Sequence, residues 1–371
     1  MNSIVQDQIG EPSADGPGGD AQEAYTFPLS FAQQRIWLLA QLEAHGPAYH
    51  ISNGVTLRGP LRADVLERAL NEIVARHEVL RTTFAILGGE PVQVVVPERR
   101  CELPVTDLRD LEPAERDAEL RRISREHASE PFHLATGPLA RFRLVRTEDE
   151  RHVFLCTMHH LITDGWSEGV FQRELAVLYR AFSRGEASPL PELPIQYGDF
   201  AVWERDWLQG EALDSLLGYW REQLAGAPDA LDLPTDRPRP AEPSYRGAIE
   251  VFSLPGEVSE ALEELGRSEQ ASLYSMLLAA YGVLLHRRSG QDQVLVGSPV
   301  ANRGQVELEG LIGLFLNTVV MRVDLSGNPT FRELLRRVRE ATYGAQEHQN
   351  LPFEKLLTEL RPVRDRSRNP F

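Results

Sequence analysis

The residues with the clearest capacity for chemistry are two adjacent histidines followed by an aspartate and a glycine. Three residues separate His160 from Asp164, His159 precedes directly and Gly165 follows directly. Histidine is the side chain whose ordinary pKa, about 6.5, suits proton transfer near neutral pH. A nearby carboxylate can orient an imidazole or anchor the loop, and glycine lets a narrow ligand pass close to the main chain. The pattern predicts a site built on His-His-x-x-x-Asp-Gly.

The elements around this motif would hold it between two rigid segments. An apolar run at 153–158 is typical of a strand, and residues 168–184 have helical periodicity. A loop between a strand and a helix is a common place for active-site residues. Neighbouring side chains of an extended segment point to opposite faces, so only one of His159 and His160 can face a reaction centre. We expect the other histidine to pack inside.

Three other interpretations stay open from the residues alone. Both histidines could be ordinary packed residues. A metal site is disfavoured, because adjacent histidines chelate poorly and no further His or Cys lies at ligand spacing. The Gly-x-Ser-x-Gly pattern at 165–169 would make Ser167 the nucleophile of an α/β-hydrolase. That motif, however, requires the serine directly after the strand and the histidine later in the chain.

Charge and composition disfavour several classes of function. The 371 residues include 39 Lys and Arg against 55 Asp and Glu, and the net charge of −16 argues against nucleic acid or an anionic membrane as partner. Lys355 is the single lysine, so there is no Walker A motif, and a Schiff-base enzyme would have to use that residue. Cys101 and Cys156 are too few for a disulfide framework. With no signal peptide or membrane-spanning stretch in the sequence, we expect a cytoplasmic protein.

Strands and helices are mixed without strict alternation, which predicts an α+β fold rather than one doubly wound sheet. We expect a flexible leader at 1–24, an N-terminal lobe at 25–187 that carries the histidine motif, and a C-terminal lobe at 188–371. The expected strands are 51–58, 79–87, 91–96, 139–146, 151–158, 248–253, 293–299 and 314–324. One expected helix begins at Ser30. The other expected helices are 62–76, 113–128, 168–184, 197–208, 211–224, 257–268, 272–288 and 330–346.

The histidine motif resembles the active-site signature of nonribosomal peptide synthetase condensation domains, members of the chloramphenicol-acetyltransferase-like superfamily. Six further segments resemble the other motifs of that family and occur in the family's order. They are 30–38 (SFAQQRIWL), 76–84 (RHEVLRTTF), 197–203 (YGDFAVW), 312–322 (IGLFLNTVVMR), 348–354 (HQNLPFE) and 364–370 (RDRSRNP). The first of these, with its Gln-Gln-Arg-Ile-Trp, is most similar to the class that accepts an L-configured donor.

The resemblance implies two chloramphenicol-acetyltransferase-like lobes in a V arrangement, with one active site at their interface. The expected reaction joins a donor acyl or peptidyl thioester to the amine of an acceptor aminoacyl thioester. Both substrates would arrive on the 4'-phosphopantetheine arms of carrier domains, next to an adenylation domain, and the domain itself would bind no cofactor or metal. The family continues beyond its seventh motif, so the C-terminal lobe is expected to be truncated at its end.

The resemblance also assigns roles to residues of this chain. His160 would be the catalytic histidine, either a general base or a group that positions the amine, and Asp164 would form a structural salt bridge with Arg322. Other residues are expected to support the site, namely Arg76, Arg81, Trp203 and Asn317, or to line the substrate tunnel, namely Trp166, Ser167 and Ser298. Arg76 and Arg81 are expected to act through structural ion pairs, and Trp203 as a core anchor.

Two alternatives share this fold. One is an acyltransferase that uses soluble acyl-coenzyme A or forms esters on a free acceptor. The other is a non-catalytic module that recruits carrier domains or other partners.

Overall fold

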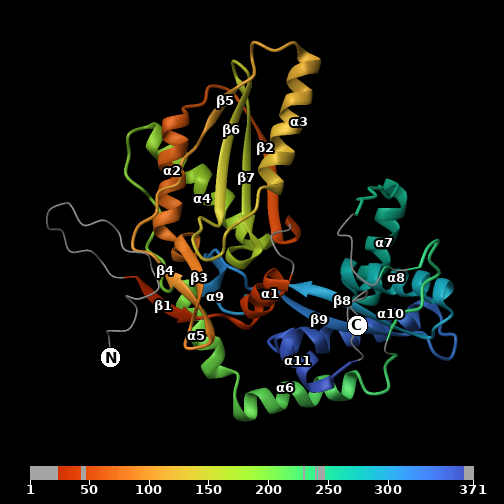
Figure 1. The fold of residues 1–371 in the computed structure, drawn as a ribbon. Coiled ribbons are helices and arrows are strands. Elements are labelled where there is room, and N and C mark those ends of the chain that lie inside the picture. Colours follow the sequence, from red (N-terminus) through yellow and green to blue (C-terminus); the bar gives the residue numbers. More distant parts are fainter. Residues whose placement is uncertain (1–23, 43–46, 229, 239, 241–246, 363–371) are drawn as a thin grey trace.

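The computed structural model describes residues 24–42, 47–228, 230–238, 240 and 247–362 (Figure 1). All but the last residue of the expected leader, and the whole of the segment 364–370, lie outside these residues. The described residues form a mixed α+β structure with three sheets, which confirms the predicted fold class.

The N-terminal half is built around a sheet of four strands in the order β2-β7-β6-β5. The strands are β2 (His50–Arg58), β7 (Arg151–His159), β6 (Ala140–Glu148) and β5 (Val105–Asp107), of which β5 alone runs parallel to its neighbour. Successive strand residues point to opposite faces. Leu144 and Phe154 therefore join the core beneath α2 (Ala63–Arg76) and α4 (Gly165–Ser183), whereas Val145 and Leu155 pack against α3 (Pro113–Ser129) on the other face.

A second, smaller sheet lies beside the first. It contains β1 (Tyr25–Pro28), β4 (Glu90–Val95) and β3 (Thr82–Leu87) in that order, all antiparallel. Two helices, α1 (Phe31–Leu42) and α5 (Tyr197–Trp207), adjoin this sheet and lead toward the C-terminal half (Figure 1).

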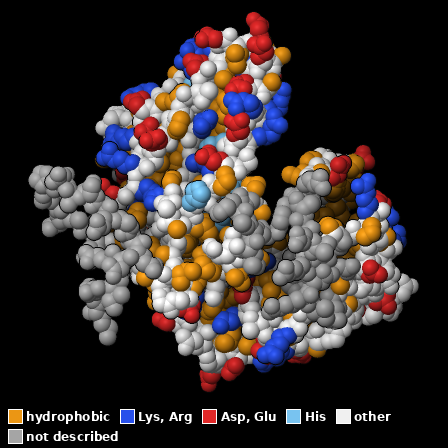
Figure 2. Space-filling view, viewed as in Figure 1, with side chains coloured by type: hydrophobic (Ala, Val, Ile, Leu, Met, Phe, Trp, Pro, Cys, Tyr) orange, Lys and Arg blue, Asp and Glu red, His pale blue; other side chains and the backbone are white. Residues whose placement is uncertain are grey.

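The C-terminal half contains an antiparallel pair of strands, β8 (Gln293–Val300) and β9 (Asn317–Asp324), joined through the short helix α9 (Val306–Glu309). The helices that pack with this pair are α6 (Gly210–Gln223), α7 (Gly256–Glu269), α8 (Leu273–Ser289), α10 (Phe331–Glu347) and α11 (Phe353–Leu360). Figure 2 shows a hollow in the surface between this half and the tall N-terminal sheet.

Two large apolar clusters form the cores of the halves. The first contains α2, α4 and the large sheet, and the second contains α6, α8, α10 and the β8-β9 pair. Each cluster also contains residues from the other half of the chain. Tyr197, Phe200 and Phe315 of the C-terminal half pack in the first cluster, and Phe31 of the N-terminal half packs in the second. The two halves are therefore interlocked by segments that each contributes to the other's core.

One expected strand is absent from the described residues. The alternating segment 248–253 pairs with no described strand, and Ile249 is 90% exposed. Alternation shows that a segment would suit a half-buried sheet, but a strand also needs a hydrogen-bonding neighbour, which the local pattern does not supply.

Candidate active site

The histidine motif lies where β7 ends and α4 begins. A single 3-10 turn, His160–Ile162, follows the strand, and Asp164 caps the helix by accepting the Ser167 backbone N–H at 2.9 Å. A carboxylate at this position satisfies one of the free N–H groups of the first helical turn. The cap fixes the start of α4 and therefore the short segment that carries both histidines.

The two histidines point to different environments, as the extended backbone predicted. His159 is buried, and its Nδ1 accepts the Leu161 N–H at 3.1 Å beside the rings of His50 and Phe132. Burial and the neighbouring histidines lower its pKa to about 3. His159 is therefore neutral at physiological pH and serves packing.

His160 is held by its own loop and lines a cavity. Its Nδ1 lies 2.8 Å from the Thr163 carbonyl oxygen. Because a carbonyl oxygen can only accept, Nδ1 carries the proton and Nε2 is left as the acceptor nitrogen. The cavity is small, about 50 Å³. Its other lining residues are Ala32, Arg35, Ile36, Glu204, Asn302, Leu314, Phe315, Leu316, Asn317, Thr318, Pro352 and Glu354, which come from both halves of the chain.

Two carboxyl groups share this cavity with His160. Glu204 of α5 accepts the Phe31 N–H at 2.9 Å, and burial raises the pKa of Glu204 to about 7. Burial also raises the pKa of Glu354, which lies 3.6 Å from the Arg35 guanidinium. The cavity therefore holds acidic groups that bind their protons more tightly than exposed carboxyls do.

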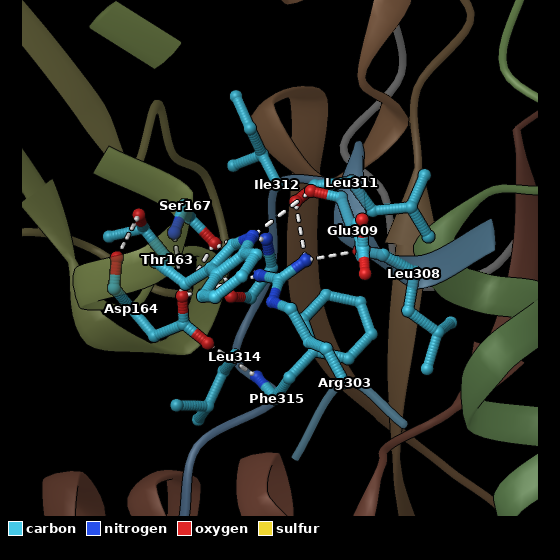
Figure 3. Close-up of polar contacts among 12 residues, drawn as sticks. Thr163, Asp164, Ser167, Arg303, Leu308, Glu309, Leu311, Ile312, Leu314 and Phe315 are labelled. Atoms are coloured by element: carbon cyan, nitrogen blue, oxygen red, sulfur yellow. Dashed lines mark hydrogen bonds and ion pairs between the residues drawn. The ribbon is translucent and has the colours of Figure 1, made fainter. Parts of the chain in front are cut away.

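Asp164 forms its salt bridge with Arg303 and not with Arg322, so this expectation was wrong. Arg303 Nη2 lies 3.3 Å from Asp164 Oδ1, and the two side chains are 1% and 2% exposed (Figure 3). Arg303 also donates to the carbonyl oxygens of Leu308 and Leu311, and Asp164 Oδ2 accepts the Phe315 N–H at 3.0 Å. The pair thus ties the start of α4 to the segment 303–315 of the other half.

Arg322 lies on β9 and makes a different set of contacts. Its guanidinium donates to the carbonyl oxygens of Gln223 and Ala225 and to the Gln293 side chain, at 2.8, 3.0 and 2.8 Å. These contacts join the end of α6 to the β8-β9 pair. Arg322 therefore stabilises the C-terminal half and does not reach the histidine motif.

Ser167 belongs to the same buried network as Asp164 and Arg303 and does not line a tunnel (Figure 3). Its Oγ lies 2.7 Å from Asp164 Oδ1, 2.8 Å from Arg303 Nη2 and 2.9 Å from the Gly313 carbonyl oxygen, and the side chain is fully buried. It stands in the third position of α4 rather than on a turn directly after the strand. Both facts contradict the hydrolase interpretation, which needs an exposed serine at that turn.

The other two residues expected in the tunnel make contacts of a different kind. Trp166 is partly exposed and donates its indole N–H to the Glu309 carbonyl oxygen at 3.0 Å, which adds a second link between α4 and the C-terminal half. Ser298 is buried in β8 and shares a hydrogen bond with the Tyr274 hydroxyl. Neither residue lines the cavity that contains His160.

The residues expected to support the site are mostly structural. Arg76 donates to Glu174 at 2.9 Å, and Glu174 also contacts the buried His77 at 2.9 Å. Arg81 pairs with Glu78 at 3.2 Å. These ion pairs agree with the interpretation of both arginines as structural.

Asn317 fastens the start of β9 to the segment before α11. Its Nδ2 donates to the carbonyl oxygens of Gln349 and Leu351 at 2.6 and 2.7 Å, and its Oδ1 accepts the Phe353 N–H at 3.0 Å. Because Asn317 also lines the His160 cavity, these bonds fix one wall of the site.

One further expectation, that Trp203 is a core anchor, needs correction. Trp203 is 40% exposed and stacks on Trp207 at 5.7 Å on the outer side of α5, so it is no core anchor. Gly165 is the first residue of α4, and its φ lies outside the left-handed region. A Cβ at Gly165 would meet no described atom within 4 Å, so the main chain there faces open space, as close passage of a ligand requires.

A larger cavity of about 720 Å³ lies between α4 and the strands β2 and β7. Its walls are largely apolar, and they include Thr163, the residue whose carbonyl holds His160. Cys156 lines it, and burial raises the pKa of this thiol, which makes Cys156 a poor nucleophile.

Two observations concern metals and membranes. Among the described residues, no group of three or more His, Cys, Asp or Glu side chains is placed to hold a metal ion. No helix in the described ranges is long and apolar enough to cross a bilayer.

Comparison with protein-family models identifies the class of this protein. The Condensation domain model matches residues 23–371, and the chain therefore belongs to the condensation domain family. One linear gramicidin synthase protein of Brevibacillus parabrevis is 50% identical over 345 residues, which is 93% of this chain but 4% of that protein. Phosphinothricin tripeptide synthetase PhsC of Streptomyces viridochromogenes is 42% identical over 97% of this chain and 32% of its own length. The chain thus spans a small part of these multi-domain relatives.

Solved structures share the fold. The X-domain from teicoplanin biosynthesis has a TM-score of 0.82 at 32% identity, covering 92% of this chain and 75% of that one. The first condensation domain of the CDA synthetase has a TM-score of 0.76 at 25% identity, covering 91% and 79%. These similarities confirm the expected condensation-domain fold.

Proposed function

We propose that the chain forms an amide bond between a donor acyl or peptidyl thioester and the amine of an acceptor aminoacyl thioester. Donor and acceptor carrier domains would supply both substrates on 4'-phosphopantetheine arms, beside an adenylation domain and in the cytoplasm. The observation that carries this proposal is His160, which keeps Nε2 as an acceptor and lines a cavity formed by both halves of the chain.

The reaction forms a C–N bond and breaks the C–S bond of the donor thioester. An amine with a pKa of about 8 is partly deprotonated at neutral pH, so its nitrogen can attack without a strong base. His160 Nε2 accepts one N–H of the amine and thereby orients the lone pair toward the donor carbonyl. The proton lost by the amine balances the thiolate that leaves, and the products are the amide and a free pantetheine thiol.

The Asp164–Arg303 pair positions the two halves of the site relative to each other. It holds the start of α4 against the segment 303–315, which leads into the cavity wall at 314–318. We therefore assign Asp164 to the alignment of the two halves around His160 and not to proton transfer.

The test is reconstitution with separately loaded carrier domains. The protein is mixed with a donor carrier bearing an acyl group and an acceptor carrier bearing an aminoacyl group, and the acceptor is examined by mass spectrometry. Condensed product on the acceptor supports the proposal. Release of thiol from soluble acyl-coenzyme A, without carrier-bound product, would instead favour the acyltransferase alternative.

A recruitment module is the second candidate. It is favoured by one observation: an X-domain from teicoplanin biosynthesis, 32% identical with a TM-score of 0.81, has been solved in complex with OxyB. A chain that binds loaded carriers but yields no condensed product would fit this candidate.

A further inference from the structure

Asn302 lines the His160 cavity and has a side-chain oxygen without a partner. It follows β8 directly before Arg303, and its Oδ1 is closed off from solvent and accepts no hydrogen bond from any described residue. Its backbone is left-handed, with φ 52°. A buried acceptor without a donor is costly, and such groups in native proteins call for an explanation.

The backbone conformation has a structural explanation, but the side chain has none. Asparagine tolerates positive φ better than most residues, and the turn at Asn302 directs Arg303 toward Asp164. Glycine would serve that purpose as well. The amide oxygen therefore invites a second role.

Several other polar side chains of the cavity already have partners. Glu204 accepts the Phe31 N–H, Glu354 lies against Arg35, and Asn317 bonds to the segment 349–353. His160 Nε2 and Asn302 Oδ1, by contrast, accept no hydrogen bond from the described residues. The terminal torsion of an asparagine side chain is soft, so Oδ1 can turn toward a donor in the cavity.

A primary amine matches this pair of acceptors. It has two N–H donors and one lone pair, so two acceptors fix the direction of the lone pair. The cavity of about 50 Å³ has room for a group of that size, since about 10–15 Å³ of volume measured in this way is enough to hold one water molecule. A hydroxyl group has a single O–H and can satisfy only one of the two acceptors.

We propose that Asn302 binds the acceptor amine, with Oδ1 accepting one N–H while His160 Nε2 accepts the other. This inference rests on the proposed condensation reaction and assigns to Asn302 the preference of that reaction for a primary amine over an alcohol. Asn302 takes no proton in the reaction. The bond changes are those of amide formation, and Asn302 contributes orientation only.

The test compares two acceptors in one reaction. Alanyl and lactyl thioesters of N-acetylcysteamine are offered in equal amounts with a loaded donor carrier, and mass spectrometry gives the ratio of amide to ester product. Asn302→Gly removes the amide and keeps a residue suited to positive φ. Asn328→Gly is the matched control, because Asn328 also has positive φ, 53°, but does not line the cavity.

We expect the amide-to-ester ratio to fall about tenfold in Asn302→Gly, which corresponds to about 1.4 kcal/mol, the size of one hydrogen bond. Asn328→Gly should give the same amide-to-ester ratio as the unaltered protein. Asn302→Asp retains acceptor oxygens and should give a ratio close to that of the unaltered protein. A prolyl acceptor has one N–H on its amine, so its rate should change little in Asn302→Gly; a purely structural role would lower both rates. If Asn302→Gly keeps the ratio of the control, the inference is wrong. If the unaltered protein makes no amide, the proposed function itself fails.

Discussion

Replacement of Asp164 by alanine should destabilise the protein as well as inactivate it. The carboxylate accepts the Ser167 N–H, the Ser167 hydroxyl and the Phe315 N–H at 2.9, 2.7 and 3.0 Å, and it faces Arg303 at 3.3 Å. Alanine would leave the guanidinium of Arg303 in a site where it is 1% exposed, without a counter-charge. The same change removes the cap of α4.

The expected magnitude follows from this geometry. Removing one partner of a buried ion pair costs about 3–5 kcal/mol, because the remaining charge stays desolvated. Loss of the helix cap, worth about 1 kcal/mol, is part of that cost. A surface pair serves as control: Glu340 contacts Arg336 at 2.7 Å with both side chains at least half exposed, so Glu340→Ala should cost less than about 1 kcal/mol.

Urea denaturation followed by tryptophan fluorescence gives the free energy of unfolding of each variant. The double variant Asp164→Ala/Arg303→Met should lose less than the sum of the two single changes, since removing both charges leaves none unpaired. A loss in Asp164→Ala no larger than that in Glu340→Ala, or strict additivity in the double variant, would refute the assignment of this pair as the link between the halves.

Two other predictions follow from the site. Because burial raises the pKa of Glu204 to about 7 from 4.5, its contribution to stability is present below about pH 4.5 and is lost as the pH rises through about 7. The free energy of unfolding of Glu204→Gln, relative to that of the unaltered protein, should therefore rise by about 3 kcal/mol from pH 5 to pH 8, as measured by urea denaturation. A difference between the two proteins that stays constant over this pH range would contradict the prediction. Arg322 has no contact with Asp164, so Arg322→Met and Asp164→Ala should be additive within about 0.5 kcal/mol, and a larger coupling would restore the pairing that the structure rejects.

The histidine motif shows how far local sequence reasoning reaches. The alternation of an extended backbone was enough to predict that His159 and His160 face different environments, because His159 is the last residue of β7 and His160 follows it directly. The cap at Asp164 was not predicted, because the helix was expected to start at 168, although its signal is local: Asp164 stands three residues before Ser167 at the start of α4. Both properties depend on residues close together in the chain.

The partner of Asp164 was not accessible in this way. Arg303 lies 139 residues away and follows a strand in a short loop, so no spacing connects it to the motif. Arg322 was the wrong choice because its place on β9 directs it toward Gln223, which only the arrangement of α6 reveals. Ser167 was misplaced for the same reason, since its hydroxyl meets Gly313 of the other half.

The exposure of a side chain and the pairing of a strand also could not be predicted from the local sequence pattern. Trp203 has the large apolar ring of a core residue, yet it stacks on Trp207 and both side chains are more than a third exposed. The segment around Val251 alternates like a strand, but pairing depends on a neighbour elsewhere in the chain. In each instance the missing information is a long-range contact.

Comparison of the unaltered protein with His160→Ala in the reconstituted reaction tests the central claim most directly. Condensed product on the acceptor carrier is quantified by mass spectrometry at neutral pH, with His286→Ala as control, because His286 is a partly exposed residue of α8. We predict that His160→Ala lowers the rate at least about 100-fold with an unchanged unfolding midpoint, while His286→Ala keeps the full rate. A rate in His160→Ala equal to that of the control would contradict the account.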